Sequence, residues 1–352
     1  MEKHTFSRIL IFWYQRYKRD LPWRHTRDPY LIWLSEVILQ QTRVKQGLPY
    51  YVRFAETFPT VQDLAHADER KILRLWQGLG YYSRARNMHL TAKIITEERG
   101  GIFPSQYEEL LKLKGIGTYT AAAIASFAFN GHAAVLDGNV FRVLARVFGI
   151  ETDMASYEGK KIFARLANDL LPDTQSDQYN QAVMEFGAMQ CTPQTPNCMF
   201  CPLNDCCIAH LTGRQDRLPV KNKKKKITHR FFHYFVVQQG EHIYMKERRK
   251  KDIWSGLYDF YLKEEAALLS LDELSADPEI SALLKHTTVE EDSEVFTHVL
   301  THQRIQVRFW KLRFSEEVPP LFLDTKGFFT LDEIRQLPKP ILIDNYLNRY
   351  YL

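Results

Sequence analysis

All five cysteines of this 352-residue chain lie within residues 191–207, CTPQTPNCMFCPLNDCC. An odd number of cysteines in a chain without an evident targeting segment argues against a disulfide framework, because the cytosol is reducing. Metal ligation explains the clustering better. Gaps of six, two and five residues separate Cys191, Cys198, Cys201 and Cys207. The prolines between them supply turns that would bring four thiolates to one site.

The unequal spacing favours an iron-sulfur cluster over zinc. Structural zinc usually binds two closely spaced cysteine pairs, whereas only Cys198 and Cys201 form such a pair here. A four-cysteine iron-sulfur cluster tolerates unequal gaps better. Zinc stays the alternative metal. Cys206 is either a thiol that binds no metal or an alternative to Cys207 as the fourth ligand.

Composition adds weaker constraints. The chain is 45% hydrophobic and 25% charged, which is ordinary for a soluble globular protein, and its length predicts two domains. No apolar run reaches the ~18 residues of a membrane span, so we expect an untargeted cytoplasmic protein. The net charge is +5, with basic blocks at 221–226 and 246–251. Such blocks contact phosphate in many proteins, although a solvated linker and a charged loop explain each of them equally well.

The six-two-five spacing resembles the iron-sulfur loop that closes the catalytic domain of the endonuclease III family of DNA repair glycosylases. This resemblance implies one [4Fe-4S] cluster held by Cys191, Cys198, Cys201 and Cys207. It also implies a helix-hairpin-helix motif upstream and an aspartate shortly after that motif.

Residues 111–127, LKLKGIGTYTAAAIASF, match the expected hairpin. Gly115 and Gly117 flank one apolar residue before an alanine-rich helix that we expect to begin near Thr118. Glycine permits positive φ and lets a DNA phosphate approach the N–H groups at the positive end of the helix. Such a contact positions DNA without reading its bases. Alone, this short motif would indicate an ordinary turn, but its place upstream of the cysteine loop favours the hairpin.

Two carboxylates are candidates for cleaving a glycosidic bond. Asp137 is predicted to cap the helix that follows it, and the N–H groups it accepts should favour its ionised form. Asp28 and Pro29 should begin another helix, on which Glu36 shares a mostly apolar face, so desolvation should raise its pKa. One neutral acid and one charged carboxylate suit an oxocarbenium-like transition state. Separately, a simple helix cap and a glutamate at the solvent edge remain the alternatives.

Longer motifs carry a closer resemblance. The chain resembles adenine DNA glycosylases of the MutY type over nearly its whole length. The motifs that carry this resemblance, with the spaced cysteines, are LPWR (21–24), SEVILQQTRV (35–44) and QGLGYYSRARN (77–87). The resemblance implies base excision repair of double-stranded DNA, in which the enzyme flips out and removes an adenine that is mispaired with 8-oxoguanine. Adenine mispaired with guanine is a further candidate substrate. It also implies a monomer that associates with the nucleoid through DNA.

The resemblance assigns roles to single residues. Glu36 is the general acid that protonates adenine, Asp137 stabilises the sugar cation, and Asn139 supports Asp137. Tyr119 stands where bifunctional lyases of the wider family carry a nucleophilic lysine, which implies a monofunctional glycosylase because a phenol forms no Schiff base. The sequence leaves open whether Asp137 captures the sugar covalently. The substrate-contact positions are Trp23, Arg24 and Gln181 for the adenine pocket, and Gln41, Thr42, Leu79 and Tyr81 around the opened base stack. For Leu79 in particular, an ordinary core position is the alternative.

The second half of the chain has a different pattern. After about residue 220, alternating runs such as HQRIQVRFWKLRF are typical of strands. With KDIWSGLYDFYL they resemble the Nudix-like C-terminal domain of adenine glycosylases, but no glutamate-rich Nudix box is present, so the domain should recognise DNA and not hydrolyse nucleotides. Thr301 and His302 match the pair that contacts the oxidised guanine, with threonine where the family more often has serine. A metal pair of His298 and His302 is disfavoured, because no carboxylate or cysteine lies near them in sequence.

The predicted fold class is multi-domain. An all-α helix-hairpin-helix glycosylase domain (1–218) containing the iron-sulfur loop is followed by a basic linker (219–228) and an α+β Nudix-like lesion-recognition domain (229–352). Two rival functions remain. A pyrimidine-specific glycosylase and lyase would need a lysine in place of Tyr119. A non-catalytic iron-sulfur protein that senses DNA damage would not need the two carboxylates.

Overall fold

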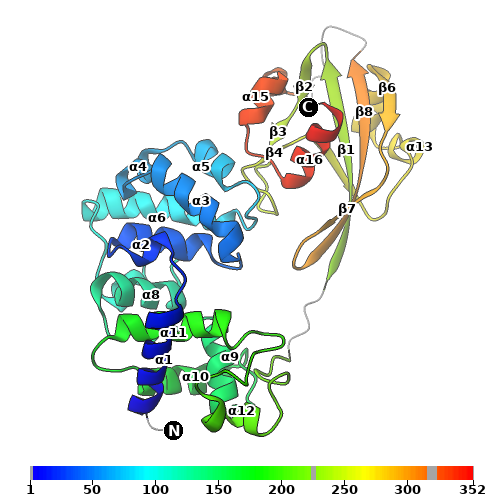
Figure 1. The fold of residues 1–352 in the computed structure, drawn as a ribbon. Coiled ribbons are helices and arrows are strands. Elements are labelled where there is room, and N and C mark those ends of the chain that lie inside the picture. The colour runs from blue at the N-terminus through cyan, green and yellow to red at the C-terminus, as the bar shows by residue number, and fades with distance from the viewer. Residues whose placement is uncertain (1–2, 223–226, 315–322, 352) are drawn as a thin grey trace. The chain divides into compact units, whose positions relative to one another are not determined.

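The structure is a computed structural model, drawn as a ribbon in Figure 1. The residues that it describes are 3–222, 227–314 and 323–351. They form two compact units: residues 3–66 join 87–222 in the first, and residues 67–86 join the described residues after 226 in the second. Residues 223–226 of the expected basic linker lie outside the described residues, and the expected domain boundaries stay a prediction.

The first unit is helical, as expected. Its elements are α1 (Lys3–Tyr17), η1 (Pro22–Arg24), α2 (Pro29–Ile38), α3 (Val44–Thr57), α4 (Val61–His66), most of α6 (Ser83–Arg99), α7 (Tyr107–Leu110), α8 (Thr118–Phe129), α9 (Gly138–Phe148), α10 (Tyr157–Leu170), α11 (Ser176–Met189), η2 (Asn204–Cys206) and α12 (Ile208–Leu211).

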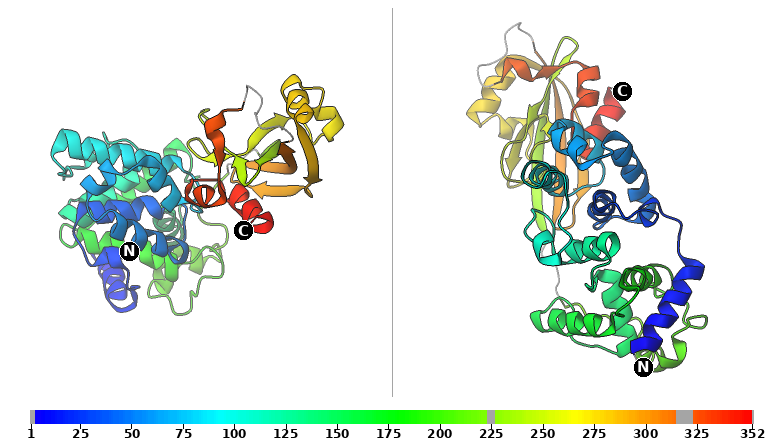
Figure 2. Two further views of the ribbon diagram at one scale, coloured as in Figure 1. Left: turned by 90° about the horizontal axis from the view of Figure 1, so that it is seen from above. Right: turned by 90° about the vertical axis from the view of Figure 1, so that its left-hand side faces the viewer.

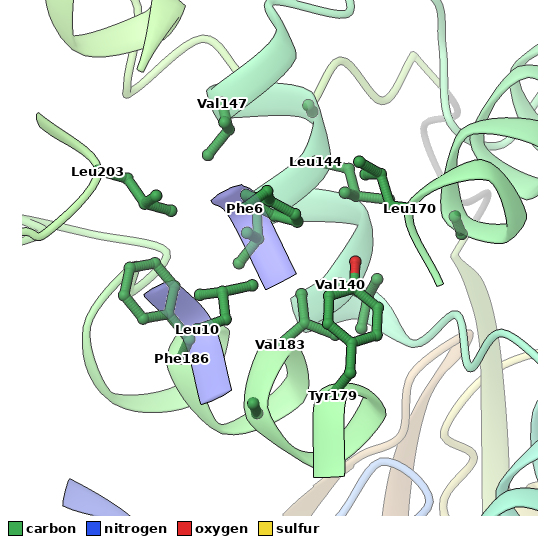
Figure 3. Packing of buried hydrophobic residues seen from close by; sticks show 14 of the residues in the cluster. Phe6, Leu10, Val140, Leu144, Val147, Leu170, Tyr179, Val183, Phe186 and Leu203 are labelled. Carbon is green, nitrogen blue, oxygen red and sulfur yellow. The ribbon is translucent and has the colours of Figure 1, made fainter. Parts of the chain in front are cut away.

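One apolar core joins α1, α9, α10 and α11 (Figure 3). Phe6 and Leu10 of α1 are four residues apart, so they lie on the same helix face, and both are fully buried. They pack into a cluster with Leu144 of α9 and Phe186 of α11. This core fixes the two helices that carry the predicted site residues Asp137 and Gln181.

A second contact, between α2 and α8, holds the other part of the site. Eight of the ten residues of α2 are buried, so the helix is apolar nearly all round and occupies the interior. The facing helix α8 is rich in buried alanines, among them Ala121 and Ala123. Small side chains let the two helices pack closely, which brings Glu36 on α2 near the first turn of α8.

The second unit is a mixed sheet with helices. Its elements are α5 (Glu69–Trp76), β1 (Thr228–Gln239), β2 (His242–Tyr244), β3 (Lys246–Glu247), β4 (Tyr258–Asp259), β5 (Tyr261–Glu265), α13 (Leu271–Leu274), α14 (Pro278–Lys285), β6 (Thr287–Asp292), β7 (Phe296–Val299), β8 (Gln303–Phe314), η3 (Thr325–Gly327), β9 (Phe328–Phe329), α15 (Leu331–Gln336) and α16 (Ile341–Tyr350).

The sheet is built around the parallel pair β1 and β8, in strand order β6-β8-β1-β2-β9. Strand β5 pairs antiparallel with β1, and β7 pairs antiparallel with β8. Alternate residues of β1 face opposite layers. Tyr234 belongs to a core with Ile343 of α16, whereas Phe235 belongs to a core with Ile280 of α14. Helices therefore cover both faces of the sheet (Figure 2), which agrees with the expected α+β domain.

The described residues include no helix that is both long enough and apolar enough to cross a membrane.

Candidate active site

Glu36 is buried on α2. As predicted, Asp28 caps this helix by accepting the N–H of Tyr30 at 2.8 Å, and Pro29 occupies its first position. The Glu36 residue is 6% exposed, and burial raises its pKa to about 7, although a hydrogen bond from the Tyr119 hydroxyl to Oε2 opposes the rise. Because the carboxyl is protonated below about pH 7, it can donate a proton near neutrality.

Asp137 caps α9, also as predicted. Its Oδ1 accepts the N–H groups of Asn139 and Val140 at 2.8 and 2.7 Å, and its Oδ2 accepts the Asn139 amide at 2.6 Å. These bonds favour the ionised form, as expected, because they lower the pKa of the carboxyl. They do not set the direction of the overall shift. Burial raises the pKa of Asp137, and the N–H groups only oppose that rise, because the cap lies in the interior and not at the surface.

Tyr119 interacts with both carboxyls, with Glu36 through a hydrogen bond and with Asp137 through its charge. It lies in the first turn of α8, donates to Glu36, and is close enough to Asp137 for the charge of that carboxylate to raise the pKa of the phenol. Burial raises this pKa further and is the largest cause. The phenol therefore stays protonated and serves as a hydrogen-bond donor to Glu36.

The glycine turn before α8 has the expected backbone. Gly115 has a φ of +77°, and a Cβ there would lie 2.7 Å from the Cβ of Asn87, so only glycine fits without strain. Gly117 is the N-cap of α8, and a Cβ built on it meets no atom within 4 Å. The open space leaves the N–H groups of the first turn accessible to an anion.

A pocket beside Glu36 gathers the residues predicted to hold the base. Trp23, Arg24 and Gln181 line it together with Glu36 itself. Trp23 comes from η1, which Pro22 begins, and its ring makes an edge contact with Tyr51 at 5.0 Å. Three segments distant in sequence thus meet at one pocket.

Glu185 was missed in the sequence analysis. It is 2% exposed and accepts paired hydrogen bonds from Arg24, at 3.1 and 2.7 Å, and from Arg19, at 2.8 and 2.6 Å. Burial alone would raise the pKa of Glu185, but the bonds from the two arginines lower it to about 2. The carboxylate therefore stays charged and orients Arg24. Its position four residues after Gln181, on the same face of α11, was the available signal.

Four cysteines line one cavity. Cys191, Cys198, Cys201 and Cys207 surround it, whereas Cys206 does not and instead donates its thiol to the carbonyl of Leu203 at 3.4 Å. The pKa of Cys201 is raised to about 12, mainly by burial, and the charges of the other three cysteines contribute to this rise. Four cysteine thiolates are the donors that an iron-sulfur cluster uses. Within the described ranges, however, no three histidine, cysteine or acidic side chains form a group that could hold a metal ion, so the cluster stays a prediction.

Two arginines of α9 hold this cysteine loop, and the sequence analysis did not single them out. Arg146 donates to the carbonyls of Thr192 and Pro193 at 2.7 and 3.0 Å. Arg142 donates to the carbonyl of Cys191 at 2.8 Å and to the side-chain oxygen of Asn139 at 2.9 Å. Helix α9 therefore connects the loop to the cap that contains Asp137.

Gln41 and Thr42 follow the C-terminus of α2. Gln41 is exposed and has a φ of +56°. Positive φ is uncommon outside glycine, and such residues often occur at functional sites. Gln40 at the end of α2 donates to Thr120 of α8 at 3.3 Å, which ties this turn to the first turn of α8.

The second unit brings together the other predicted contacts. Leu79, Tyr81, Thr301 and His302 line one pocket, and the hydroxyls of Tyr81 and Thr301 are hydrogen-bonded. Tyr81 is 44% exposed with a φ of +47°, whereas Leu79 is 7% exposed. The burial of Leu79 agrees with the core position considered as its alternative, so its insertion into DNA stays a prediction. His298 contacts the ring of Trp254 edge-on, which gives it a packing role.

The chain matches two families. Residues 34–172 match the HhH-GPD superfamily of base excision DNA repair proteins, and residues 206–349 match the NUDIX domain. Fold and site thus define a helix-hairpin-helix DNA repair glycosylase with a second, Nudix-type domain. An adenine DNA glycosylase of Buchnera aphidicola subsp. Baizongia pistaciae is 38% identical over 73% of each chain. A second, of subsp. Schizaphis graminum, is 32% identical over 97% of this chain and 98% of the relative. The chain belongs to the adenine DNA glycosylase family.

Further relatives agree with this assignment. The adenine DNA glycosylase of Rattus norvegicus is 45% identical over 61% of this chain and 43% of its own length. Among solved structures, a thermostable thymine-DNA glycosylase superposes with a TM-score of 0.56 at 29% identity, over 60% of this chain and 97% of that one. An endonuclease III–DNA complex, with a TM-score of 0.52 at 22% identity over 60% of this chain and 98% of that one, shares the fold. The predicted family, fold class and enzyme class, a hydrolase of N-glycosyl bonds, are confirmed.

Proposed function

We propose that this enzyme removes adenine opposite 8-oxoguanine, and also opposite guanine, from double-stranded DNA as a monofunctional glycosylase acting as a monomer. The observation that carries the proposal is the buried Glu36, with a pKa of about 7, in a pocket lined by Trp23, Arg24 and Gln181. The names of the relatives supply adenine as the base.

The chemistry follows from the two carboxyls. Glu36 gives its proton to a ring nitrogen of the flipped adenine, so the bond between sugar and base breaks with both electrons leaving on a neutral base. Asp137, as carboxylate, stabilises the cation that develops on the sugar, and Asn139 holds it in place. Water then adds to the sugar and loses a proton, which yields an abasic site. Tyr119 offers no amine, so no Schiff base forms and the strand stays intact.

DNA would be held at several places. The open turn at Gly117 and the first N–H groups of α8 would accept a backbone phosphate. Gln41 and Tyr81, both exposed and at positive φ, would enter the base stack where adenine has left it.

The second unit would recognise the oxidised guanine. Thr301 and His302 are exposed at the rim of a pocket shared with Tyr81. A hydroxyl and an imidazole supply both donors and acceptors for a base edge. The Tyr81–Thr301 hydrogen bond would hold the threonine hydroxyl in one orientation.

The four cysteines that line the cavity would hold one [4Fe-4S] cluster. Its contribution would be structural, because hydrolysis of the glycosidic bond transfers no electrons. Arg142 of α9 contacts both Cys191 and Asn139. A cluster that fixes the loop would therefore also help to fix the cap that contains Asp137.

The test is a duplex that contains adenine opposite 8-oxoguanine, with a matched adenine:thymine duplex as control. Strand breaks should appear only after alkali, and Glu36→Gln should abolish them. Breaks without alkali would favour the lyase alternative. Specific binding of the lesion duplex without release of adenine would favour the damage-sensing protein.

A further inference from the structure

Tyr14 contacts two residues of the base pocket from behind, and the proposed mechanism does not use it. Its side chain is buried in α1, where the residue is 4% exposed. The hydroxyl donates to the carbonyl Oε1 of Gln181 at 2.6 Å. The Arg24 guanidinium lies 5.5 Å from the centre of its ring. One tyrosine thus contacts both Gln181 and Arg24, two of the polar residues that line the pocket with Glu36.

The hydrogen bond selects one orientation of the Gln181 side chain. A carboxamide is an acceptor at one end and a donor at the other. With its carbonyl bonded to Tyr14, Gln181 has its amino group left for a molecule in the pocket. A flipped amide would turn that amino group toward the phenol, and the buried hydroxyl would lose its acceptor, which is costly.

The charge state of the phenol keeps this arrangement stable around neutral pH. Burial raises the pKa of Tyr14, while Arg24 lowers it and Glu185 raises it. The hydroxyl therefore keeps the proton that it donates. Arg24 is itself hydrogen-bonded to Glu185 and to the carbonyl of Arg19 at 2.7 Å, so both pocket side chains that Tyr14 contacts have buried partners.

We propose that Tyr14 is a positioning residue that presents the Gln181 amino group to the flipped base and thereby selects a base with an unprotonated ring nitrogen. This inference rests on the proposed removal of adenine. Adenine offers such acceptors at N1, N3 and N7, and a pocket that presents a fixed donor favours them over a base edge carrying N–H.

The test removes only the hydroxyl. Tyr14→Phe keeps the ring beside Arg24 and should slow single-turnover release of adenine roughly fivefold, the effect of one neutral hydrogen bond. The position of the pH profile should not change, because Glu36 is untouched. Tyr17→Phe, one turn further along α1 and 55% exposed, is the matched control and should behave as wild type.

Coupling to Gln181 separates positioning from a general structural role. In a Gln181→Ala background, Tyr14→Phe should cause no further change, whereas a structural role would cause the same fivefold loss in both backgrounds and overturn the inference. If wild type does not release adenine at all, the proposed function fails instead.

The chemistry of the selected base can be read from affinity. In a Glu36→Gln background, which binds without cutting, Tyr14→Phe should weaken binding of duplexes that contain adenine. The weakening should vanish for one of 1-deaza-, 3-deaza- or 7-deazaadenine. Persistence of the effect with all three analogues would overturn the ring-nitrogen assignment.

Discussion

Tyr119→Phe should move the pH dependence of adenine release to higher pH. In the wild type, Glu36 donates a proton and burial raises its pKa to about 7, so the rate should fall as pH rises through that value. The Tyr119 hydroxyl donates to the ionised carboxylate and therefore opposes the rise. Phenylalanine removes this opposition, so Glu36 should stay protonated to higher pH.

The magnitude follows from the strength of the lost bond. A hydrogen bond to a charged group contributes about 1.5–3 kcal/mol, and one pKa unit corresponds to about 1.4 kcal/mol. Both partners are buried, so solvent screens the interaction little. The alkaline limb should therefore move up by about one to two units, while the rate at the plateau falls less than tenfold.

The measurement is the single-turnover rate of adenine release between pH 5 and 9, a range chosen to span the expected limb on both sides. Tyr157→Phe, at an exposed position (85%) on α10, is the control for loss of a phenol and should leave the profile unchanged. Glu36→Gln should remove the limb together with activity. An unchanged limb in Tyr119→Phe, or a limb moved to lower pH, would refute the reasoning that Tyr119 stabilises the ionised form of Glu36.

Three further predictions test other parts of the structure. Cys201→Ser should abolish the broad visible absorption of the purified protein, whereas Cys206→Ser should keep it, because only the first residue lines the shared cavity; equal loss in both would contradict the ligand set. Arg142→Lys should keep the positive charge but lose the two hydrogen bonds of the guanidinium to Cys191 and Asn139. It should lower the rate of adenine release at least tenfold with little change in duplex affinity. An unchanged rate would mean that the arginine does not support the cap of α9. Gly115→Ala should lower the free energy of unfolding by about 1–3 kcal/mol in chemical denaturation, because the φ of Gly115 is positive and a Cβ would clash. Gly117→Ala should leave stability nearly unchanged and weaken DNA binding. Equal stability of the two variants would contradict the backbone assignment.

The local patterns that proved predictive were those set by short-range physics. The Asp28 cap with Pro29, the Asp137 cap and the beginning of α8 after Gly117 depend on a few neighbouring residues, and the structure has all of them. The apolar face around Glu36 was also visible from helical spacing, and it correctly predicted a raised pKa.

Contacts between distant segments were harder to predict. Asp137 accepts the expected N–H groups, but its burial depends on how α9 packs against other helices, so the direction of its pKa shift could not be read locally. The spacing from Gln181 marks Glu185 as a neighbour on α11, but the partners of Glu185 and Tyr14 lie more than 160 positions away in sequence, and no local pattern identifies those partners. Arg142 and Arg146 have the spacing of ordinary helix residues, and only the fold brings their guanidinium groups to the first residues of the cysteine loop.

Helix α9 connects the cysteine loop mechanically to the carboxylate of Asp137, which caps the other end of the helix. With a rise of about 1.5 Å per residue, the nine residues from Asp137 to Arg146 span roughly 13 Å. A tilt of only about 5° around the Arg146 end would displace the carboxylate by roughly 1 Å, and a misplacement of that size can cost about a hundredfold in rate. A displacement of the cysteine loop would therefore reach the Asp137 carboxylate through Arg146 and lower the rate of base removal, even where the rest of the fold is unchanged.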